Sequence, residues 1–500
     1  MQMEAVTQKG QTDDVRYFDV IIVGAGISGV GSAHFLKKNC PDLSYVLLET
    51  QEAYGGTWHT HRYPGVRSDS DLYTFGFSFK PWVESPIATG ERILTYLNAV
   101  IQEDDLERHI RYRHRVVSAN WDSKRKRWDL VVRNEQLGQD LRFSTNFLWM
   151  CQGYYQHDQG YTPEWPGMES FEGQIVHPQT WPSDLDYADK NILLIGSGAT
   201  AATLVPALAE KAAHVTMLQR SPTYFNPGTN ADALADQLRA LEIDENWIHA
   251  IIRKKLLKEQ EGRLLRAQNE PDAVAKEMIS AVAANLGPSV DVAEHFTPAY
   301  RPWQQRVAFI PEGDFFEPFR DGKASIVTDT IETFTPQGVR LKSGRTLEAD
   351  IIVTATGFRL SVLGGIAFSK DGAPLNLADT VTYHGMMFTG VPNLVWVFGY
   401  FRSSWTLRVE LIADFVTRLL KHMRTIGKEM VTVELRKEDQ GEPLLPWIDE
   451  ENFNPGYLTR DMHLMPKRLN KPEWQHTQDY FAECIRLPQI SFSDAAFHFS

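Results

Sequence analysis

The sequence predicts an α/β protein with two Rossmann-like dinucleotide-binding domains and a helical insertion in the second. Two apolar, β-branched runs each end in a Gly-rich loop and lead into a helix-compatible stretch, at Gly24–Gly29 and at Gly196–Ala201. A strand, a Gly-rich turn and a helix in this order present backbone N–H groups to a pyrophosphate. From Ala231 to Gly287 helical spacing predicts the insertion, with charge runs such as Arg253-Lys-Lys on its solvated face.

The first domain combines a Gly-rich loop with an acidic residue at the end of its second strand. The turn glycines are Gly24, Gly26 and Gly29, and a second apolar run ends at Glu49, 25 positions after Gly24 (49 − 24). An acid at this position can bind the ribose hydroxyls of an adenosine without a 2′-phosphate. This domain alone therefore indicates FAD or NAD and does not distinguish them.

The second domain ends the corresponding strand in a basic residue. Its turn, Gly196-Ser-Gly198, has Ala201 as the third small residue, and the next strand run ends in Arg220 and Ser221. A carboxylate would repel a 2′-phosphate, whereas a guanidinium can pair with it through two hydrogen bonds. We therefore expect NADPH in this domain and FAD in the first. The alternative is that Arg220 is a solvated surface residue.

Three segments make up the predicted domains. Residues 1–155 are the first part of the FAD-binding domain, and residues 156–348 are the NADPH-binding domain, with its helical insertion at about 230–300. Residues 349–500 are the return to the FAD-binding domain and a C-terminal region. The apolar strand from Asp350 to Thr354 is expected to make that return.

Composition excludes several classes of function. The net charge of −13 argues against sequence-independent nucleic-acid binding, which needs clustered Lys and Arg. The three cysteines form no CxxC, so a vicinal redox dithiol is excluded and a reduced, cytoplasmic setting is the simplest account. No apolar run reaches the roughly 18 residues of a transmembrane span. The polar stretch Met1–Arg16 is expected to be a disordered lead-in.

The loop after the first βαβ unit is expected to run over a bound ligand. It extends from Gly55 to Asp69, is rich in glycine, aromatic residues and arginine, and has no periodicity. His59 and His61 are two positions apart, but no further Cys or carboxylate completes a ligand set. We therefore expect no metal site there.

Two dinucleotides in one chain imply hydride transfer from NADPH to a flavin. Without a CxxC, reduction of a disulfide is unsupported. The reduced flavin can then activate oxygen at its C4a atom or pass electrons to an external acceptor. These residues leave both routes open.

Two longer motifs resemble those of a known family. Phe171-x-Gly-x-x-x-His177-x-x-x-Trp181-Pro182 matches the short fingerprint of the type I Baeyer–Villiger monooxygenases, which are class B flavoprotein monooxygenases. The segment from Gly56 to Asp69 matches the family's longer pattern, Gly-x-Trp-x-x-x-x-Tyr-Pro-Gly-x-x-x-Asp. The sequence is most similar to the bacterial ethionamide-activating monooxygenase subgroup, through residues 67–71, 196–201 and 219–224.

The resemblance implies a reaction. NADPH would reduce FAD, O2 would add at flavin C4a, and the peroxyflavin would attack a ketone to give a Criegee adduct that rearranges to an ester or lactone. The substrates would be O2 and a small-molecule ketone or thio-compound, with sulfoxidation as a side activity. The alternatives are an N- or S-oxygenating flavin-containing monooxygenase and a flavin NADPH oxidase without oxygen insertion. The sequence predicts no oligomeric state.

The resemblance also implies roles for individual residues. Arg306 would be the catalytic cation, and Asp69 would orient and activate it. Gln305 departs from the family, in which many members have Lys just before this Arg, so NADPH preference would rest more heavily on Arg220. His177 would be an interdomain residue that affects cofactor positioning. FAD is expected to contact Gly24, Gly26, Ser28, Gly29, Glu49, Gly56, Thr57, Trp58 and the backbone near Val117. Arg67, Ser68 and Asp69 are expected where flavin and nicotinamide meet. NADPH is expected to contact Gly196, Ser197, Gly198, Ala199, Thr200, Ala201, Ala202, Arg220 and Ser221.

Overall fold

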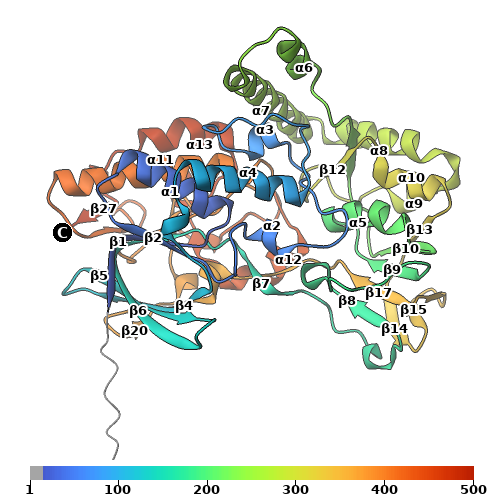
Figure 1. Cartoon of the computed structure of the whole chain (residues 1–500), viewed down its shortest axis with the longest axis horizontal. Coiled ribbons are helices and arrows are strands. Elements are labelled where there is room, and N and C mark those ends of the chain that lie inside the picture. Colours follow the sequence, from blue (N-terminus) through green and yellow to red (C-terminus); the bar gives the residue numbers. More distant parts are fainter. Residues whose placement is uncertain (1–14) are drawn as a thin grey trace, which may run out of the picture.

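A nine-stranded sheet carries the first Gly-rich loop (Figure 1). The computed structural model describes residues 15–500, so the expected lead-in lies outside the described residues except for its last two. Strand β1 lies between β6 and β2 and is parallel to both. The strand order is β20-β19-β4-β5-β6-β1-β2-β3, and β23 also pairs with β6. The strands are β1 (Arg16–Val23), β2 (Tyr45–Leu48), β3 (Ile110–Arg111), β4 (His114–Asp122), β5 (Arg127–Asn134), β6 (Gln139–Met150), β19 (Ala367–Lys370), β20 (Ala373–Pro374) and β23 (Leu394–Trp396).

The second half of strand β1, residues 20–23, is buried on both faces, which explains its uninterrupted apolar sequence. Val20 and Ile22 belong to one hydrophobic core, and Ile21 and Val23 belong to another. Helices cover the first face: α1 (Ile27–Asn39), α4 (Gly90–Glu103) and α11 (Trp405–Thr425). The second face packs against the antiparallel strands β4 and β5 and against aromatic residues of the C-terminal part, such as Trp396.

A five-stranded, fully parallel sheet carries the second Gly-rich loop. Its order is β13-β10-β9-β17-β8. Helix α5 (Ala199–Ala209) and α10 (Glu317–Arg320) pack on one face, and a three-stranded antiparallel sheet packs on the other. Both Gly-rich loops therefore follow parallel strands, as predicted for the α/β class. The strands are β8 (Gln174–Val176), β9 (Asn191–Ile195), β10 (His214–Gln219), β13 (Ala324–Thr328) and β17 (Ile351–Thr354), with β14 (Ile331–Thr335), β15 (Gly338–Leu341) and β16 (Thr346–Glu348) in the smaller sheet.

One strand lies in a different sheet from the one we predicted. β17 was expected to return to the first domain, but it pairs with β9 and β8 in the five-stranded sheet. A parallel strand buried on both faces has the same apolar sequence in either sheet, so the pattern could not distinguish them. The chain rejoins the nine-stranded sheet at β19, and the second domain therefore includes residues up to Thr354.

The helical insertion lies between two paired strands, β11 (Phe225–Gly228) and β12 (Ala308–Pro311). Its helices are α6 (Ala233–Ala240), α7 (Glu245–Asn269), α8 (Pro271–Leu286) and α9 (Val292–His295). Helices α6 and α7 project from the rest of the molecule (Figure 1). The prediction of a solvated charge run is wrong for Arg253, which is buried. Its guanidinium reaches the first domain, where the C-terminal carbonyls of a short helix, α3 (Leu72–Phe75), accept its hydrogen bonds.

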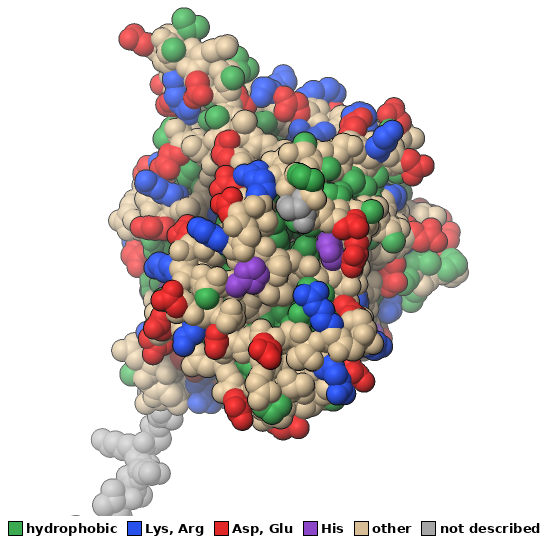
Figure 2. Space-filling view, turned by 90° about the vertical axis from the view of Figure 1, so that its right-hand side faces the viewer, with side chains coloured by type: hydrophobic (Ala, Val, Ile, Leu, Met, Phe, Trp, Pro, Cys, Tyr) green, Lys and Arg blue, Asp and Glu red, His purple; other side chains and the backbone are tan. Residues whose placement is uncertain are grey.

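An antiparallel ribbon connects the two sheets, and the C-terminal region packs on it. The ribbon consists of β7 (Tyr155–Gly160) and β18 (Phe358–Leu360), and α12 (Gly456–Asp461) contacts β18. The remaining elements are α2 (Thr57–Thr60), β21 (Thr382–Tyr383), β22 (Met387–Phe388), β24 (Val431–Val433), β25 (Leu445–Pro446), β26 (Lys467–Arg468), α13 (Tyr480–Arg486) and β27 (Phe497–Phe499). Among the described residues no helix is long and apolar enough to cross a membrane. Figure 2 shows acidic and basic side chains interspersed on the face it presents.

Candidate active site

A cavity of about 1070 Å³ is lined by both Gly-rich loops. Many of the predicted site residues line it and thus come together from distant parts of the sequence. These residues are Gly24, Gly26, Ser28, Glu49, Gly56, Thr57, Trp58, Arg67, Ser68, Asp69, Gly198, Ala199, Thr200 and Arg306. The other predicted residues lie behind the cavity wall or outside it: Gly29, Val117, Gly196, Ser197, Ala201, Ala202, Arg220 and Ser221.

The first Gly-rich loop has no room for side chains. Gly24 has a φ of +103°, and a Cβ atom there would lie 2.7 Å from the carbonyl oxygen of Cys151. A Cβ atom at Gly29 would lie 1.9 Å from the carbonyl oxygen of Gly24. Helix α1 begins directly after Gly26, so its N-terminal N–H groups are at the cavity. This open backbone cradle fits the pyrophosphate of a dinucleotide.

Glu49 connects the loop to the cavity wall. Its Oε2 accepts a hydrogen bond of 2.7 Å from the Ala25 N–H, and its Oε1 accepts one of 2.8 Å from the Gln51 N–H. Burial raises the pKa of the Glu49 carboxyl, and these N–H groups oppose the rise. Each carboxylate oxygen can accept a second hydrogen bond, so the side chain can hold the loop and also bind a ribose hydroxyl.

Asp69 and Arg306 form a two-pronged ion pair on the cavity wall. The Nε of Arg306 donates to Oδ2 of Asp69 at 2.6 Å, and its Nη2 donates to Oδ1. Burial acts to raise the pKa of Asp69, but the charge and hydrogen bonds of Arg306 outweigh it and hold that pKa below its ordinary value. The charge of Asp69 raises the pKa of Arg306. The 45 % of the Arg306 side chain that is exposed faces the cavity that it lines.

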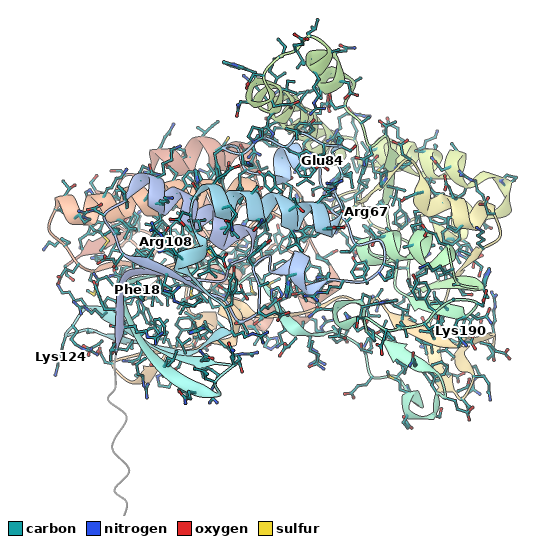
Figure 3. All side chains as sticks on the ribbon, viewed as in Figure 1. Phe18, Arg67, Glu84, Arg108, Lys124 and Lys190 are labelled. Atoms are coloured by element: carbon teal, nitrogen blue, oxygen red, sulfur yellow. The ribbon has the colours of Figure 1, made fainter. Side chains whose placement is uncertain are left out.

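Arg67 bridges the two parts of the chain that carry the sheets (Figure 3). Its Nη2 donates to Oδ1 of Asp314 at 2.9 Å, and its Nη1 donates to Oδ2. Asp314 follows β12 in the second domain. Since Arg67 also lines the cavity, this ion pair fixes its charge at the position where we expected flavin and nicotinamide to meet.

The second Gly-rich loop has the same geometry as the first. Gly196 has a φ of +128°, and a Cβ atom there would lie 2.3 Å from the carbonyl oxygen of Ala355. Helix α5 begins directly after Gly198, which lines the cavity. Ala201 and Ala202 are buried, as small residues packed between helix and strand must be. The open backbone of this loop therefore also fits a pyrophosphate.

Arg220 and Ser221 lie at the exposed end of β10. The loop that they begin turns back to the cavity, which Thr223 lines. The hydroxyls of Ser197 and Thr223 are 2.9 Å apart and tie this loop to the second Gly-rich loop. Arg220 therefore begins a loop that is bonded to the second Gly-rich loop, and its side chain is exposed, so both interpretations of this residue stay open.

Val117 lies at an irregular position of strand β4. The pairing of β4 with β5 shifts in register between Val116 and Ser118, which removes Val117 from the ladder. Its side chain is 43 % exposed, whereas Val116 and Arg115 line the cavity. Such a bulge leaves backbone groups without a partner strand, and the contact between FAD and the backbone near Val117 stays a prediction.

The chain has relatives along almost its whole length. The family model described as flavin-binding monooxygenase-like matches residues 18–230. The FAD-containing monooxygenase EthA of Mycolicibacterium smegmatis is 43% identical over 486 residues, which cover 97% of this chain and 97% of that protein. The chain belongs to the flavin-binding monooxygenase-like family. It is therefore a flavin monooxygenase, and the resemblance seen in its motifs is confirmed.

Another relative supports this family assignment, and solved structures have a similar fold. The probable FAD-binding monooxygenase AlmA of Acinetobacter sp is 42% identical over 483 residues, covering 96% of both chains. Oxidized steroid monooxygenase bound to NADP has a TM-score of 0.76 at 24% identity, covering 97% of this chain and 99% of that one. Epsilon-caprolactone-bound cyclohexanone monooxygenase has a TM-score of 0.75 at 19% identity, covering 97% and 100%. These structures confirm the predicted fold class.

His177 connects the fingerprint of this flavin monooxygenase to the interdomain ribbon. Its Nδ1 accepts a hydrogen bond of 3.1 Å from the Gln179 N–H, so its Nε2 carries the proton and donates to the Gly357 carbonyl at 3.2 Å. Burial lowers the pKa of His177 to about 4. The imidazole is therefore neutral near pH 7 and holds two segments together, which supports an interdomain role.

Sequence reasoning missed several cavity residues of the flavin monooxygenase. The indole Nε1 of Trp405 donates to Oγ of Ser28 at 2.8 Å, and the Tyr155 hydroxyl donates to Oγ1 of Thr57 at 2.8 Å. Tyr154 and Tyr457 also line the cavity. Aromatic residues in apolar surroundings have the pattern of ordinary core residues, and no signal in one sequence separates the two.

Proposed function

We propose that this flavin monooxygenase uses FAD, NADPH and O2 to insert one oxygen atom next to a ketone carbonyl, giving an ester or lactone. The observation that supports this reaction best is the Arg306–Asp69 ion pair on a cavity wall that both Gly-rich loops also line. The relatives are named as FAD-containing, and solved structures of similar fold are bound to FAD and NADP. The proposed substrates are a small-molecule ketone or thio-compound and O2.

The two cradles fit the two cofactors. We place FAD at the first Gly-rich loop and NADPH at the second, because the first unit ends in the acid Glu49 and the second in Arg220. FAD would contact Gly24, Gly26, Ser28, Gly29, Glu49, Gly56, Thr57, Trp58 and the Val117 backbone, and NADPH would contact Gly196–Ala202, Arg220 and Ser221, with Arg67, Ser68 and Asp69 between them. When bound, NADPH supplies hydride and FAD supplies the redox and oxygen chemistry.

Arg306 supplies a fixed positive charge to this reaction. Addition of a nucleophile to a ketone develops negative charge on the carbonyl oxygen, and a preorganised donor stabilises it without reorienting. Asp69 preorganises the guanidinium through two hydrogen bonds and keeps it charged. Loss of one such donor typically costs about 10²–10³ in rate.

The test is isotopic. The holoenzyme is incubated with NADPH, a panel of linear, cyclic and aromatic ketones and ¹⁸O2, and the products are analysed by mass spectrometry. We expect an ester or lactone that carries one ¹⁸O atom. NADPH-dependent oxidation of sulfides or amines without any ester would replace the proposal with a heteroatom monooxygenase, and hydrogen peroxide as the sole product would replace it with an oxidase.

A further inference from the structure

Two tyrosines from distant parts of the chain lie near Arg306. Tyr154 follows the end of strand β6, and Tyr457 lies on α12 in the C-terminal region. Both line the cavity that Arg306 and Asp69 also line. Their ring centroids are 6.1 Å apart. Arg306 lines the same cavity, and its positive charge acts to lower the pKa of both phenols.

The two rings are held by other aromatic side chains. Tyr154 stacks on Trp405 with ring centroids 5.3 Å apart and meets Phe401 edge-on at 5.8 Å. Tyr457 contacts Phe401 and Phe358, each at 6.3 Å. Packing of this kind fixes the direction of each phenol, because an edge-to-face or stacked neighbour blocks its rotation.

Helix α12 holds Tyr457 in place. The guanidinium of Arg460, one turn after Tyr457, lies 3.4 Å from the centroid of the Tyr161 ring. Its Nη2 also donates to the Phe358 carbonyl at 2.8 Å. Tyr161 directly follows β7 and Phe358 begins β18, so the C-terminal helix is anchored to the interdomain ribbon.

The tyrosine hydroxyls can donate into the cavity. In the part of the chain that the structure describes, neither hydroxyl is hydrogen-bonded to a further side chain, and each phenol affects the pKa of the other. Two phenols carry two O–H groups, so if one donates to the other, one O–H remains free. Burial raises the pKa of both tyrosines more than Arg306 lowers it, so both keep their protons at neutral pH.

We propose that Tyr154 and Tyr457 are catalytic residues that, together with Arg306, form a hydrogen-bond-donor pocket for the carbonyl oxygen of the substrate. This inference rests on the proposed function, since a ketone supplies the oxygen that the pocket would bind. The phenols transfer no proton. They donate a hydrogen bond that strengthens as negative charge develops on the oxygen, as donors in an oxyanion hole do.

The pocket has a consequence for substrate choice. A ketone presents an oxygen that accepts the free phenolic hydrogen, whereas a thioether presents only a weakly accepting sulfur. Removing the hydroxyls should therefore impair ketone oxidation and leave sulfoxidation nearly unchanged. If the two tyrosines acted only through aromatic packing, removing their hydroxyls would change ketone oxidation and sulfoxidation to the same extent.

The experiment compares Tyr154→Phe, Tyr457→Phe and the double variant with Tyr383→Phe, a buried tyrosine remote from the cavity. FAD content and the rate of flavin reduction by NADPH are measured first, and we expect wild-type values for all four. The kcat/KM for a ketone that the wild type oxidises should fall about tenfold in the double variant and in the single variant that loses the free O–H, which is the effect of losing one neutral hydrogen bond. The kcat/KM for thioanisole should stay within about twofold in every variant.

A binding measurement separates this proposal from the proposed function. N,N-Dimethylbenzamide has a strongly accepting carbonyl oxygen and is not oxidised, and its dissociation constant is obtained from the absorption of bound flavin in the oxidised holoenzyme. Binding should weaken about tenfold in the double variant and not in Tyr383→Phe. If the double variant keeps both the amide affinity and the ketone kcat/KM of the wild type, the proposed donor pocket is refuted and the proposed reaction is not. A wild type that makes no ester would overturn the proposed function, and weakened amide binding would then still support the pocket.

Discussion

Arg253 of the helical insertion and Glu410 of helix α11 form an ion pair with an Nη2–Oε2 distance of 3.1 Å. The Nη1 of Arg253 also donates to the carbonyl oxygens of Tyr73, Thr74 and Gly76. Only 10% of the arginine side chain and 14% of the glutamate side chain are exposed. The insertion belongs to the second domain by sequence, so this contact docks it on the first domain.

Replacing Arg253 should therefore destabilise the protein strongly. Arg253→Met keeps the length of the side chain but removes the positive charge that pairs with Glu410 and the donor that three carbonyl groups share. Removing one partner of a buried ion pair costs about 3–5 kcal/mol. The apparent free energy of unfolding in urea measures the effect, with Lys254→Met, at an exposed neighbouring position, as control. A loss no larger than that of the control would mean that the contact contributes little.

Arg306→Ala should separate flavin reduction from oxygen insertion. The ion pair with Asp69 is broken, but the contacts of the two Gly-rich loops are left intact. We expect anaerobic reduction of the flavin by NADPH at a rate close to that of the wild type, and a loss of ester formation of about 10²-fold or more. Stopped-flow absorbance measures the rate of flavin reduction, and gas chromatography measures ester formation. Arg340→Ala, which removes a surface ion pair, is the control, and ester formation by Arg306→Ala at the control's rate would refute the role.

Arg220→Ala should weaken the preference for NADPH over NADH. Arg220 follows the end of β10 and begins the loop that returns to the cavity at Thr223. A hydrogen bond to a charged group contributes about 1.5–3 kcal/mol, so the KM for NADPH should rise at least tenfold. The KM for NADH is the internal control, because NADH has no 2′-phosphate. Equal changes in both constants would mean that Arg220 acts on the fold of the loop.

Local patterns predicted the parts of the structure that depend on neighbours in sequence. A Gly-rich turn between a strand and a helix needs only about ten residues, and both loops have the expected geometry. The Asp69–Arg306 pair joins residues far apart in sequence, and only the family resemblance brought them together. Arg253, an ordinary helix-surface residue by pattern, is buried because α7 docks on α3, and this docking cannot be derived from the sequence of α7.

The burial of His177 predicts a dependence of stability on pH. Burial lowers its pKa to about 4 in the folded protein, compared with about 6.5 in an unfolded chain. The unfolded chain therefore binds the proton first as the pH falls. The contribution of His177 to stability is complete above about pH 6.5 and is lost as the pH falls towards 4.

His177→Gln removes this titration and keeps an N–H donor for the Gly357 carbonyl. Urea unfolding at pH 8, 6.5, 5.5 and 4.5 should give a shallower loss of stability in the variant, by at most about 1.4 kcal/mol per pH unit. The stability of the variant will still depend on pH, because other buried histidines titrate; burial lowers the pKa of His476, for example, to about 3. His498→Gln, at an exposed position, should retain the wild-type slope; an equal slope in His177→Gln would contradict the prediction.

Two helical glycines give a matched test of the first cradle. Gly29 in α1 and Gly262 in α7 both lie inside helices. A Cβ atom at Gly29 would lie 1.9 Å from the Gly24 carbonyl oxygen, whereas a Cβ atom at Gly262 would have no heavy atom within 4 Å. Gly29→Ala must therefore push the loop away from the helix, whereas Gly262→Ala only improves helix propensity, by up to about 1 kcal/mol. We expect the first variant to purify with little flavin and the second to keep the wild-type ratio of flavin to protein absorbance. Full flavin content in Gly29→Ala would show that the close approach of loop and helix is not what holds the cofactor.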